Sequence, residues 1–427
     1  MANIFNSISH QIVAQIQQPI CLLLLQILLI LVTSRVFGLL FSKFKQPAVI
    51  GEIVAGIFLG LSVFGNLFPH LFNFIFPTNS FNNLEVLSKI GLAFFMFIIG
   101  MELDLVALRK RAKSAFIISI SSILIPLLLG IFLAYYLYTS FSMPNVRFSI
   151  FALFMGISLS ITAFPVLARI VKARGMQKTE LGTLALSAAA IADVIAWCLL
   201  AMMIALAKAG DFSIGLFTIL SAIGYILAMF FIIRPFINNM IARLRSAHYG
   251  DQSIVLLSFI LLLSSAFTAE IIGIHMLFGA FLAGVIIPQN EKLKHALTSK
   301  LEDVSELFLL PIFFAFTGLR LQISLLNTPY LWLISLLVIA MAMIGKFAGT
   351  TIPAKLTGMN WKDSFSLGAF MNTRGLMELV VLNIGYELHI LSPELFAILV
   401  IMAILTTIIT SPLLDLIEYL FKNKNLG

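Results

Sequence analysis

Charged residues are scarce in this chain. Asp, Glu, Lys and Arg make up only 11% of its 427 residues, whereas 60% are hydrophobic and the mean hydropathy is +1.07. A soluble protein of this length would carry about a quarter charged residues, so the composition excludes a soluble globular fold. Strand-like alternation at roughly ten-residue spacing is also missing, which argues against a membrane β-barrel. The sequence therefore predicts an all-α polytopic membrane protein.

Residues that hold metals, cofactors or covalent cross-links are equally sparse. The chain has only Cys21 and Cys198, both within apolar runs, and its six His are scattered, so we predict neither a disulfide nor a metal cluster. No nucleophile–base pair, HExxH motif or phosphate-binding loop is visible. An enzyme is therefore the least favoured class, and no cofactor is predicted. The net charge of +8 lies in short loops, where it sets membrane topology and does not indicate nucleic acid as a partner.

Apolar segments fill most of the sequence. Because roughly 17–25 apolar residues cross a bilayer as a helix, we predict about thirteen spans. They lie at 19–40, 48–65, 87–103, 114–138, 147–172, 181–206, 213–236, 253–272, 275–288, 307–321, 330–352, 365–386 and 395–414. Residues 1–427 are expected to form a single transmembrane domain without a soluble regulatory domain.

Lys and Arg gather on one side of these spans. That side collects the basic residues at 43–45, 109–113, 172–178, 243–245, 292–300, 355–362 and 422–424. The other side holds only Lys89, Arg147, Lys208 and Arg320. Because cytoplasmic loops carry the basic excess, the N-terminus is predicted outside and the C-terminus in the cytoplasm. Without a targeting peptide, a bacterial plasma (inner) membrane is expected.

Two predicted spans are interrupted in mid-course. The fifth breaks at 162–165 and the twelfth at 372–375. The first six and the last six spans would form inverted repeats, with the seventh as connector, and the two breaks then occupy corresponding positions. Paired interrupted helices in corresponding halves are the best sequence pointer to a transporter's binding site.

One carboxylate lies deep in a predicted span. Asp193 sits in a run of Ala, Ile and Leu, and its neighbours one turn away are Ala189, Ala190 and Ala196. Intramembrane carboxylates usually mark ion or proton pathways, and small residues let another helix approach closely. A proton or a monovalent cation can neutralise this carboxylate, and their competition is itself an exchange mechanism. The alternative is an Asp held by a buried basic residue purely for packing.

The break in the fifth span supplies oxygen ligands. Unwound carbonyls near Thr162 and Ala163, with the hydroxyls of Thr162 and Ser160, are hard donors that suit Na⁺, K⁺ or Li⁺. We therefore predict a Na⁺ or K⁺ site formed by Asp193 and Thr162, with Ala163 and Ser160 beside them. A simple proline kink, whose freed carbonyl a neighbouring Ser or Thr satisfies, is the alternative.

Three further charged residues lie inside predicted spans. Lys346 is mid-way along the eleventh. It could be a counter-ion to Asp193, a neutraliser of the interrupted helices' dipole ends, or a proton-coupled group. Arg374 and Glu378 are four residues apart, so one helical face can carry both, and we favour a structural pair.

Several stretches, in this order, resemble one known family. They are KQPAVIGEIVAGIFLG (45–60), FFMFIIGMELDL (94–105), SITAFPVLARI (160–170), LSAAAIADVIAW (186–197), IHMLFGAFLAGVIIP (274–288), GKFAGT (345–350) and NTRGLMELVVLNIG (372–385). Together they cover nearly the whole chain. They resemble the monovalent cation:proton antiporters of the second branch, which includes plant cation/proton exchangers and bacterial sodium/proton and potassium-efflux carriers.

The resemblance implies a sodium/proton antiporter-like fold. It implies a core domain with two crossed discontinuous helices, a separate dimerisation domain and hence a homodimer, and elevator-like movement of the core in the lipid bilayer. By motif, Asp193 would be the ion-binding aspartate, Thr162 would lie in the unwound crossing segment and Lys346 would be the core lysine.

Ala192 departs from the family pattern. Electrogenic members carry a second acid there, paired with the lysine, and other members carry Asn. Ala can neither ionise nor donate a hydrogen bond. We therefore expect electroneutral exchange of one Na⁺ or K⁺ for one H⁺, with Lys346 turned to Asp193. An organic-anion or other solute carrier that uses Lys346, and a channel-like or non-transporting relative, are the alternatives.

Overall fold

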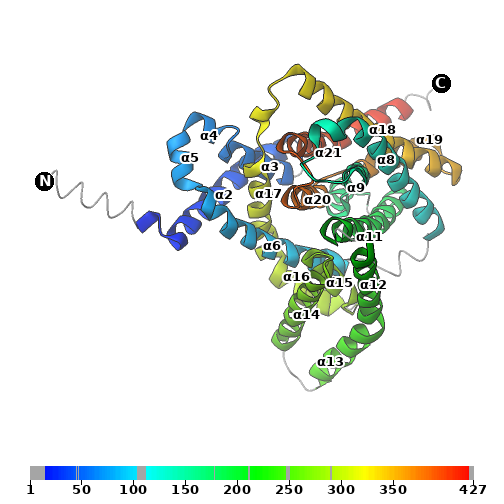
Figure 1. The fold of residues 1–427 in the computed structure, drawn as a ribbon. Helices are drawn as coiled ribbons and strands as arrows, with labels where there is room; N and C mark the ends of the chain where they lie inside the picture. Colours follow the sequence, from blue (N-terminus) through cyan, green and yellow to red (C-terminus); the bar gives the residue numbers. More distant parts are fainter. Residues whose placement is uncertain are drawn as a thin grey trace. The chain divides into compact units, whose positions relative to one another are not determined.

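The computed structural model is built from helices (Figure 1). It describes residues 15–44, 46, 48–102, 112–176, 178–209, 212–246, 251–288 and 291–422. Within these residues, the only extended pairing is an isolated bridge between Ser142 and Leu391. Part of the sequence used to predict the orientation, including Lys45 and the basic residues at 109–111, lies outside the described residues.

The predicted spans agree with the helices in the described part of the chain. Ten helices are long and apolar enough to cross a membrane, and each overlaps one predicted span. The other three predictions, the fifth, ninth and twelfth, fall on short or broken helices, namely α9–α10, α15 and α19–α20. This confirms the expected all-helical membrane fold. The second break lies at 372–375 as predicted, whereas the first lies at 161–163 and not at 162–165, because Phe164 and Pro165 already belong to α10.

The helices follow one another in this order. They are α2 (Pro19–Lys43), α3 (Ala48–Leu59), α4 (Phe64–Leu67), α5 (Pro69–Ile75), α6 (Phe81–Glu102), α8 (Ala112–Phe141), α9 (Phe148–Ser160), α10 (Phe164–Ala173), α11 (Glu180–Ala209), α12 (Phe212–Ala228), α13 (Arg234–Ser246), α14 (Asp251–Ile272), α15 (Met276–Ile286), α16 (Glu291–Val304), α17 (Leu310–Arg320), α18 (Pro329–Leu356), α19 (Trp361–Met371), α20 (Leu376–Glu387) and α21 (Pro393–Lys422). Contacts divide the chain into two compact units, which are described separately.

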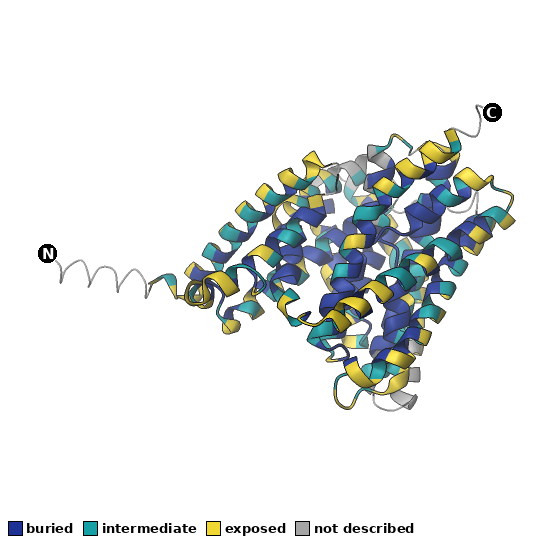
Figure 2. Ribbon diagram, turned by 90° about the horizontal axis from the view of Figure 1, so that it is seen from above, coloured by how far each residue is buried: buried dark blue, intermediate teal, exposed yellow. Residues whose placement is uncertain are grey.

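Unit 1 comprises Met1–Phe95 and Glu302–Ser324. Here α3 packs against α2 and α17. Gly56 allows α3 to approach α17 closely, since a Cβ at this position would lie 2.1 Å from the Ala315 carbonyl oxygen. One face of α2 is buried, and its other face is exposed yet apolar. Figure 2 shows such two-sided helices as ribbons with both dark blue and yellow segments. An exposed apolar face suits lipid and not water.

Unit 2 comprises Met96–Leu301 and Leu325–Gly427 and holds both broken helices. In it α8 packs against α9, α11 and α18. Close approach of α18 to α8 depends on small residues, since a Cβ at Gly349 would lie 2.9 Å from the Ser121 carbonyl oxygen. The Ser119 hydroxyl donates to the Ala188 carbonyl at 2.7 Å, which ties α11 to α8. Helices α11 and α18 each contact α9 and α19, which end at the two breaks.

Two of the described helices, α5 and α16, lie outside every span predicted from the sequence. The predicted span at 307–321 is preceded by α16, which runs through a π-helical turn (Ser305–Leu309) into α17. The α16 sequence is rich in Lys, Glu, Leu and Ala, which are good helix formers, but it is too polar for a search for apolar spans to find.

Candidate functional site

The first break separates α9 from α10. Helix α9 ends at Ser160, residue Ile161 is extended (φ −67°, ψ 139°), and α10 begins at Phe164. Pro165 is the second residue of α10, where its missing N–H is tolerated, but it cannot donate to the carbonyl four residues earlier. Among the described residues, no donor reaches the carbonyls of Ile161 and Thr162. The break therefore exposes two backbone oxygen acceptors inside the bundle.

The second break separates α19 from α20. Gly375 caps α20 with φ +145°, and a Cβ there would lie 2.8 Å from Val166 Cγ2. Thr407 of α21 bridges this break, since its hydroxyl accepts from the Arg374 N–H at 3.1 Å, and its one hydrogen is shared between the carbonyls of Arg374 at 2.9 Å and Ala403 at 2.8 Å. A positive φ, a close approach and an outside hydroxyl thus hold the second break in one conformation.

The two breaks contact each other directly. The Ala163 N–H donates to the Thr373 carbonyl at 2.9 Å. The Thr162 hydroxyl donates to the Met371 carbonyl at 3.0 Å. The crossing is therefore held by hydrogen bonds between the two unwound segments, and the predicted pairing of the interruptions is correct in space.

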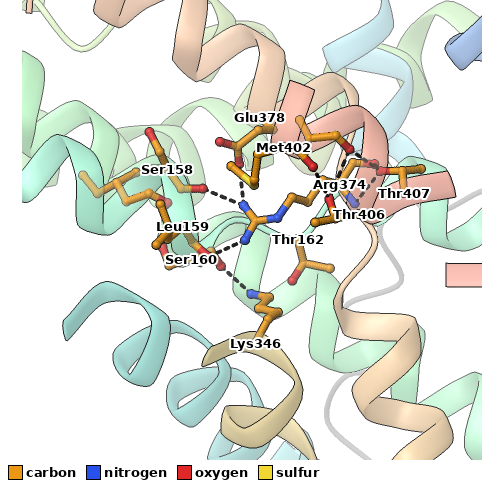
Figure 3. Close-up of polar contacts among 12 residues, drawn as sticks. Ser158, Leu159, Ser160, Thr162, Lys346, Arg374, Glu378, Met402, Thr406 and Thr407 are labelled. Atoms are coloured by element: carbon orange, nitrogen blue, oxygen red, sulfur yellow. Dashed lines mark hydrogen bonds and ion pairs between the residues drawn. The ribbon is translucent and has the colours of Figure 1, made fainter. Parts of the chain in front are cut away.

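Arg374 closes the end of α9 (Figure 3). Its guanidinium donates to the carbonyls of Ser158 and Leu159, each at 2.6 Å, and to Glu378 Oε2 at 3.1 Å. Arg374 and Glu378 are both fully buried. The last carbonyls of a helix lack intrahelical donors and carry partial negative charge. The arginine satisfies both needs, and Glu378 balances its charge as predicted.

Lys346 completes the same cap. Its ammonium donates to the carbonyl of Ser122 at 3.0 Å and to the carbonyl of Ser160. It interacts electrostatically with Asp193, but among the described residues its hydrogen bonds go to carbonyls and not to that carboxylate. Lys346 thus lies at the negative end of α9, one of the roles that its position allowed, and it is not turned into an ion pair with Asp193.

Asp193 faces the opposite kind of helix end. Its side chain is buried with 4% of its surface exposed, and it accepts the backbone N–H of Phe164, the first residue of α10. A helix N-terminus carries partial positive charge and free N–H groups, so it favours an anion. Among the described residues, Asp193 Oδ1 has no hydrogen-bond partner. One carboxylate oxygen is thus positioned and the other is available.

The predicted site residues lie together, but in different roles. Asp193 of α11 contacts the first residue of α10, next to the unwound Thr162 and Ala163. The Thr162 hydroxyl donates its hydrogen to Met371 and keeps its lone pairs. The Ser160 hydroxyl donates to the Ile157 carbonyl at 2.8 Å, while its carbonyl accepts from Lys346. The Ala163 carbonyl accepts the Leu167 N–H at 3.0 Å.

Several functional groups were missed by sequence reasoning. Buried oxygens without a hydrogen-bond partner also include Ser158 Oγ, Asn372 Oδ1 and Thr373 Oγ1. Buried polar atoms without a partner are rare in native structures. Their only sequence signal is that they are polar residues at or near the predicted breaks. No group of three His, Cys, Asp or Glu suited to a metal centre occurs in the part of the chain that the structure describes.

Two broken helices that cross at buried charges, within a bundle of membrane-spanning helices, define the class of secondary transporters. Comparison with known proteins gives the family. A family model described as "Sodium/hydrogen exchanger, transmembrane" matches residues 28–416. The Na(+)/H(+) antiporter NhaS4 of Synechocystis sp. is 44% identical over 393 residues, which cover 92% of this chain and 96% of that protein. The chain belongs to the sodium/hydrogen exchanger family and is an integral membrane protein.

Two further similarities fit this assignment. Cation/H(+) antiporter 19 of Arabidopsis thaliana is 38% identical over 397 residues, which cover 93% of this chain and 49% of that protein. The chain therefore spans about half the length of this plant relative. The solved structure of the sodium proton antiporter MjNhaP1 from Methanocaldococcus jannaschii aligns with a TM-score of 0.63 at 17% identity, covering 91% of this chain and 94% of that one. The latter likeness shows a shared fold.

Proposed function

We propose that this protein exchanges a monovalent cation, Na⁺ or K⁺, for H⁺ across the membrane, with Asp193 as the shared binding group. The observation that carries the proposal is the buried Asp193 carboxylate at the start of α10, one of whose oxygens has no partner. A charge buried in this way needs either a proton or a cation. The names of the antiporter relatives support the same activity.

The cation would be coordinated at the first break. Asp193 Oδ1 and the free carbonyls of Ile161 and Thr162 are hard oxygen donors. They belong to one site because Asp193 accepts the N–H of Phe164, the residue that follows the first break. The Thr162 hydroxyl oxygen adds a further donor. Such oxygens suit Na⁺ and K⁺ alike. Ala163 and Ser160 would shape this segment through their backbones and not through their side chains.

Charge counting leads to one-for-one exchange. Ala192 next to Asp193 cannot ionise, and Arg374 and Glu378 neutralise each other. A single carboxylate that alternates between H⁺ and M⁺ carries the same net charge in both directions. Moving one net charge against 100 mV involves about 2.3 kcal/mol, and an electroneutral carrier does not experience this cost.

Reorientation would take the form of an elevator movement. We propose that unit 2, which holds both breaks, carries the bound ion across, and that unit 1 belongs to the dimerisation part of a homodimer. The membrane would be a bacterial plasma membrane, with the N-terminus outside and the C-terminus in the cytoplasm. The organic-anion alternative needs a free Lys346 ammonium, and two of its three N–H donors already go to carbonyls.

The test is cation-induced proton movement in proteoliposomes. Na⁺, K⁺ and Li⁺ are added separately to the wild type, to Asp193→Asn and to Glu418→Gln, which alters an exposed carboxylate on α21. We expect at least one cation to move protons in the wild type and in Glu418→Gln, and none to do so in Asp193→Asn. Proton movement in Asp193→Asn would contradict the shared site.

Voltage tests the stoichiometry separately. A membrane potential imposed at fixed ion gradients should leave the exchange rate unchanged. A strong dependence on voltage would contradict one-for-one exchange without contradicting Asp193 as the site.

A further inference from the structure

A recess lies against α11, the helix that carries Asp193. It is a cavity of about 360 Å³ within unit 2. Its walls come from α11, α12 and α15. The wall residues used here are Val194, Cys198, Met202, Ala222, Ile226 and Phe278.

The cavity is apolar throughout. Every lining side chain is a hydrocarbon, a thioether or a thiol. The Tyr225 and Ser265 hydroxyls of the same unit are satisfied, because they lie 2.5 Å apart and Ser265 donates to the Gly279 carbonyl at 2.6 Å. Apolar cavities stay dry and take up apolar molecules. Neither water nor a cation suits this space.

The cavity reaches the outer surface of membrane-spanning helices. Ile223 of α12 lines it and is 49% exposed, and Cys198 of α11 is exposed as well. The neighbouring α12 residues Leu220 and Leu227 are also exposed and apolar. Because these helices cross the membrane, the medium at the mouth is hydrocarbon. A molecule that enters from the side is therefore a membrane lipid.

Helix α11 has the cavity and the candidate ion site on adjacent faces. Asp193 and Leu200 belong to its buried face, whereas Val194, Cys198 and Met202 recur at four-residue spacing along the cavity. We propose that the cavity binds one acyl chain of a membrane phospholipid, lodged against the α11 face that adjoins Asp193. With about 30 Å³ for each water-sized group, the space holds about a dozen methylene or methyl groups.

Photo-crosslinking tests this site. The full chain is placed in vesicles of phosphatidylethanolamine and phosphatidylglycerol containing a phospholipid with a diazirine near the end of one acyl chain. Label is then mapped by mass spectrometry in wild type, in Ala222→Phe, which occupies part of the cavity, and in Leu220→Phe, which places the same ring on the lipid-facing side of α12.

We expect label on the cavity residues of α11 in wild type and in Leu220→Phe. In Ala222→Phe this label should fall about tenfold, because excluding two methylenes from an apolar site costs about that factor in affinity. Equal labelling of α11 in all three proteins would overturn the proposal, and so would wild-type label spread evenly over exposed helix faces.

A second measurement does not depend on the folding of Ala222→Phe. In Cys21→Ala the one remaining cysteine is Cys198, which lines the cavity. In detergent, added phospholipid should slow the reaction of Cys198 with a lipid-soluble maleimide. An unchanged rate would show that no chain covers Cys198 and would contradict the proposal. Neither readout requires exchange, so either result leaves the proposed antiport to its own test.

Discussion

The two helix breaks differ in how their backbone polar groups are satisfied. In the second break, the protein satisfies its own backbone: Thr407 bridges the Arg374 N–H and carbonyl. In the first break, the carbonyls of Ile161 and Thr162 and one oxygen of Asp193 have no partner among the described residues. At the second break the Arg374 backbone is thus satisfied by an outside hydroxyl, although the side-chain oxygens of Asn372 and Thr373 have no partner among the described residues. At the first break the backbone carbonyls themselves are left open.

The difference shows how a transporter can separate stability from binding. The basic side chains of Arg374 and Lys346 cap the negative end of α9, so the carbonyls of that end already have donors. The positive end of α10 faces Asp193, where the proposed exchange would bind a cation and a proton in turn. We therefore expect substitutions at the second break to cost stability, and substitutions at the first break to cost exchange.

The largest loss of stability is expected from Arg374→Met. It leaves Glu378 charged without a partner and removes the donors to Ser158 and Leu159. Breaking a buried ion pair in this way costs about 3–5 kcal/mol. Thermal unfolding of the purified protein measures it, with the exposed Lys362→Met as control.

The double variant Arg374→Met/Glu378→Met sharpens this prediction. Removing both partners of a buried pair is far less costly than removing one, so the double variant should be more stable than Arg374→Met alone. If Arg374→Met unfolds at the same temperature as Lys362→Met, the second break does not depend on its arginine.

A smaller loss is expected from Gly375→Ala. The positive φ of +145° costs a non-glycine residue about 1–3 kcal/mol, and the new Cβ meets Val166 at 2.8 Å. Gly358→Ala is the matched control, because it shares a positive φ of +97° but meets nothing within 4 Å. Gly375→Ala should unfold at the lower temperature of the two. Equal melting temperatures would show that the approach to Val166 carries no cost.

A third loss, of about 1 kcal/mol, is expected from Thr407→Val because it removes the hydroxyl that bridges Arg374. Thr406→Val is the control, since this neighbouring buried hydroxyl bonds only to carbonyls of its own helix. Chemical unfolding in detergent compares the two. If Thr406→Val loses as much stability as Thr407→Val, the bridge across the second break has no special role.

The smallest effect on stability is expected from Asp193→Asn. The amide can still accept the Phe164 N–H, and no basic partner is left behind because Lys346 is bonded to carbonyls. The free energy of unfolding should change by less than about 0.5 kcal/mol, the range usual for substitutions at exposed positions. Exchange, in contrast, should be lost. A stability loss as large as that of Arg374→Met would make Asp193 a structural residue.

Much of this site could be predicted from the sequence, because its main signals are costly exceptions to an apolar pattern. Asp193, Lys346 and Arg374 are charges inside apolar spans, and Pro165 and Gly375 disrupt helices by their own chemistry. The breaks and their crossing follow from these residues together with the resemblance to a known family.

The partners of the charges could not be predicted in the same way. Lys346 and Arg374 donate to the carbonyls of Ser122, Ser158, Leu159 and Ser160. Every residue carries a backbone carbonyl, so the sequence does not show which ones are left free by the end of a helix in space. The expectation that Lys346 turns to Asp193 considered side chains alone.

The most direct test of the account is to count protons released when a cation binds to the detergent-solubilised protein. Titration calorimetry in buffers of different ionisation enthalpy gives this number for wild type and for Asp193→Asn. If the first break is the shared site, each cation that binds to the wild type displaces a proton in a pH range where Asp193 is protonated, and Asp193→Asn neither binds the cation nor releases a proton. Cation-linked proton release that persists in Asp193→Asn would contradict the account.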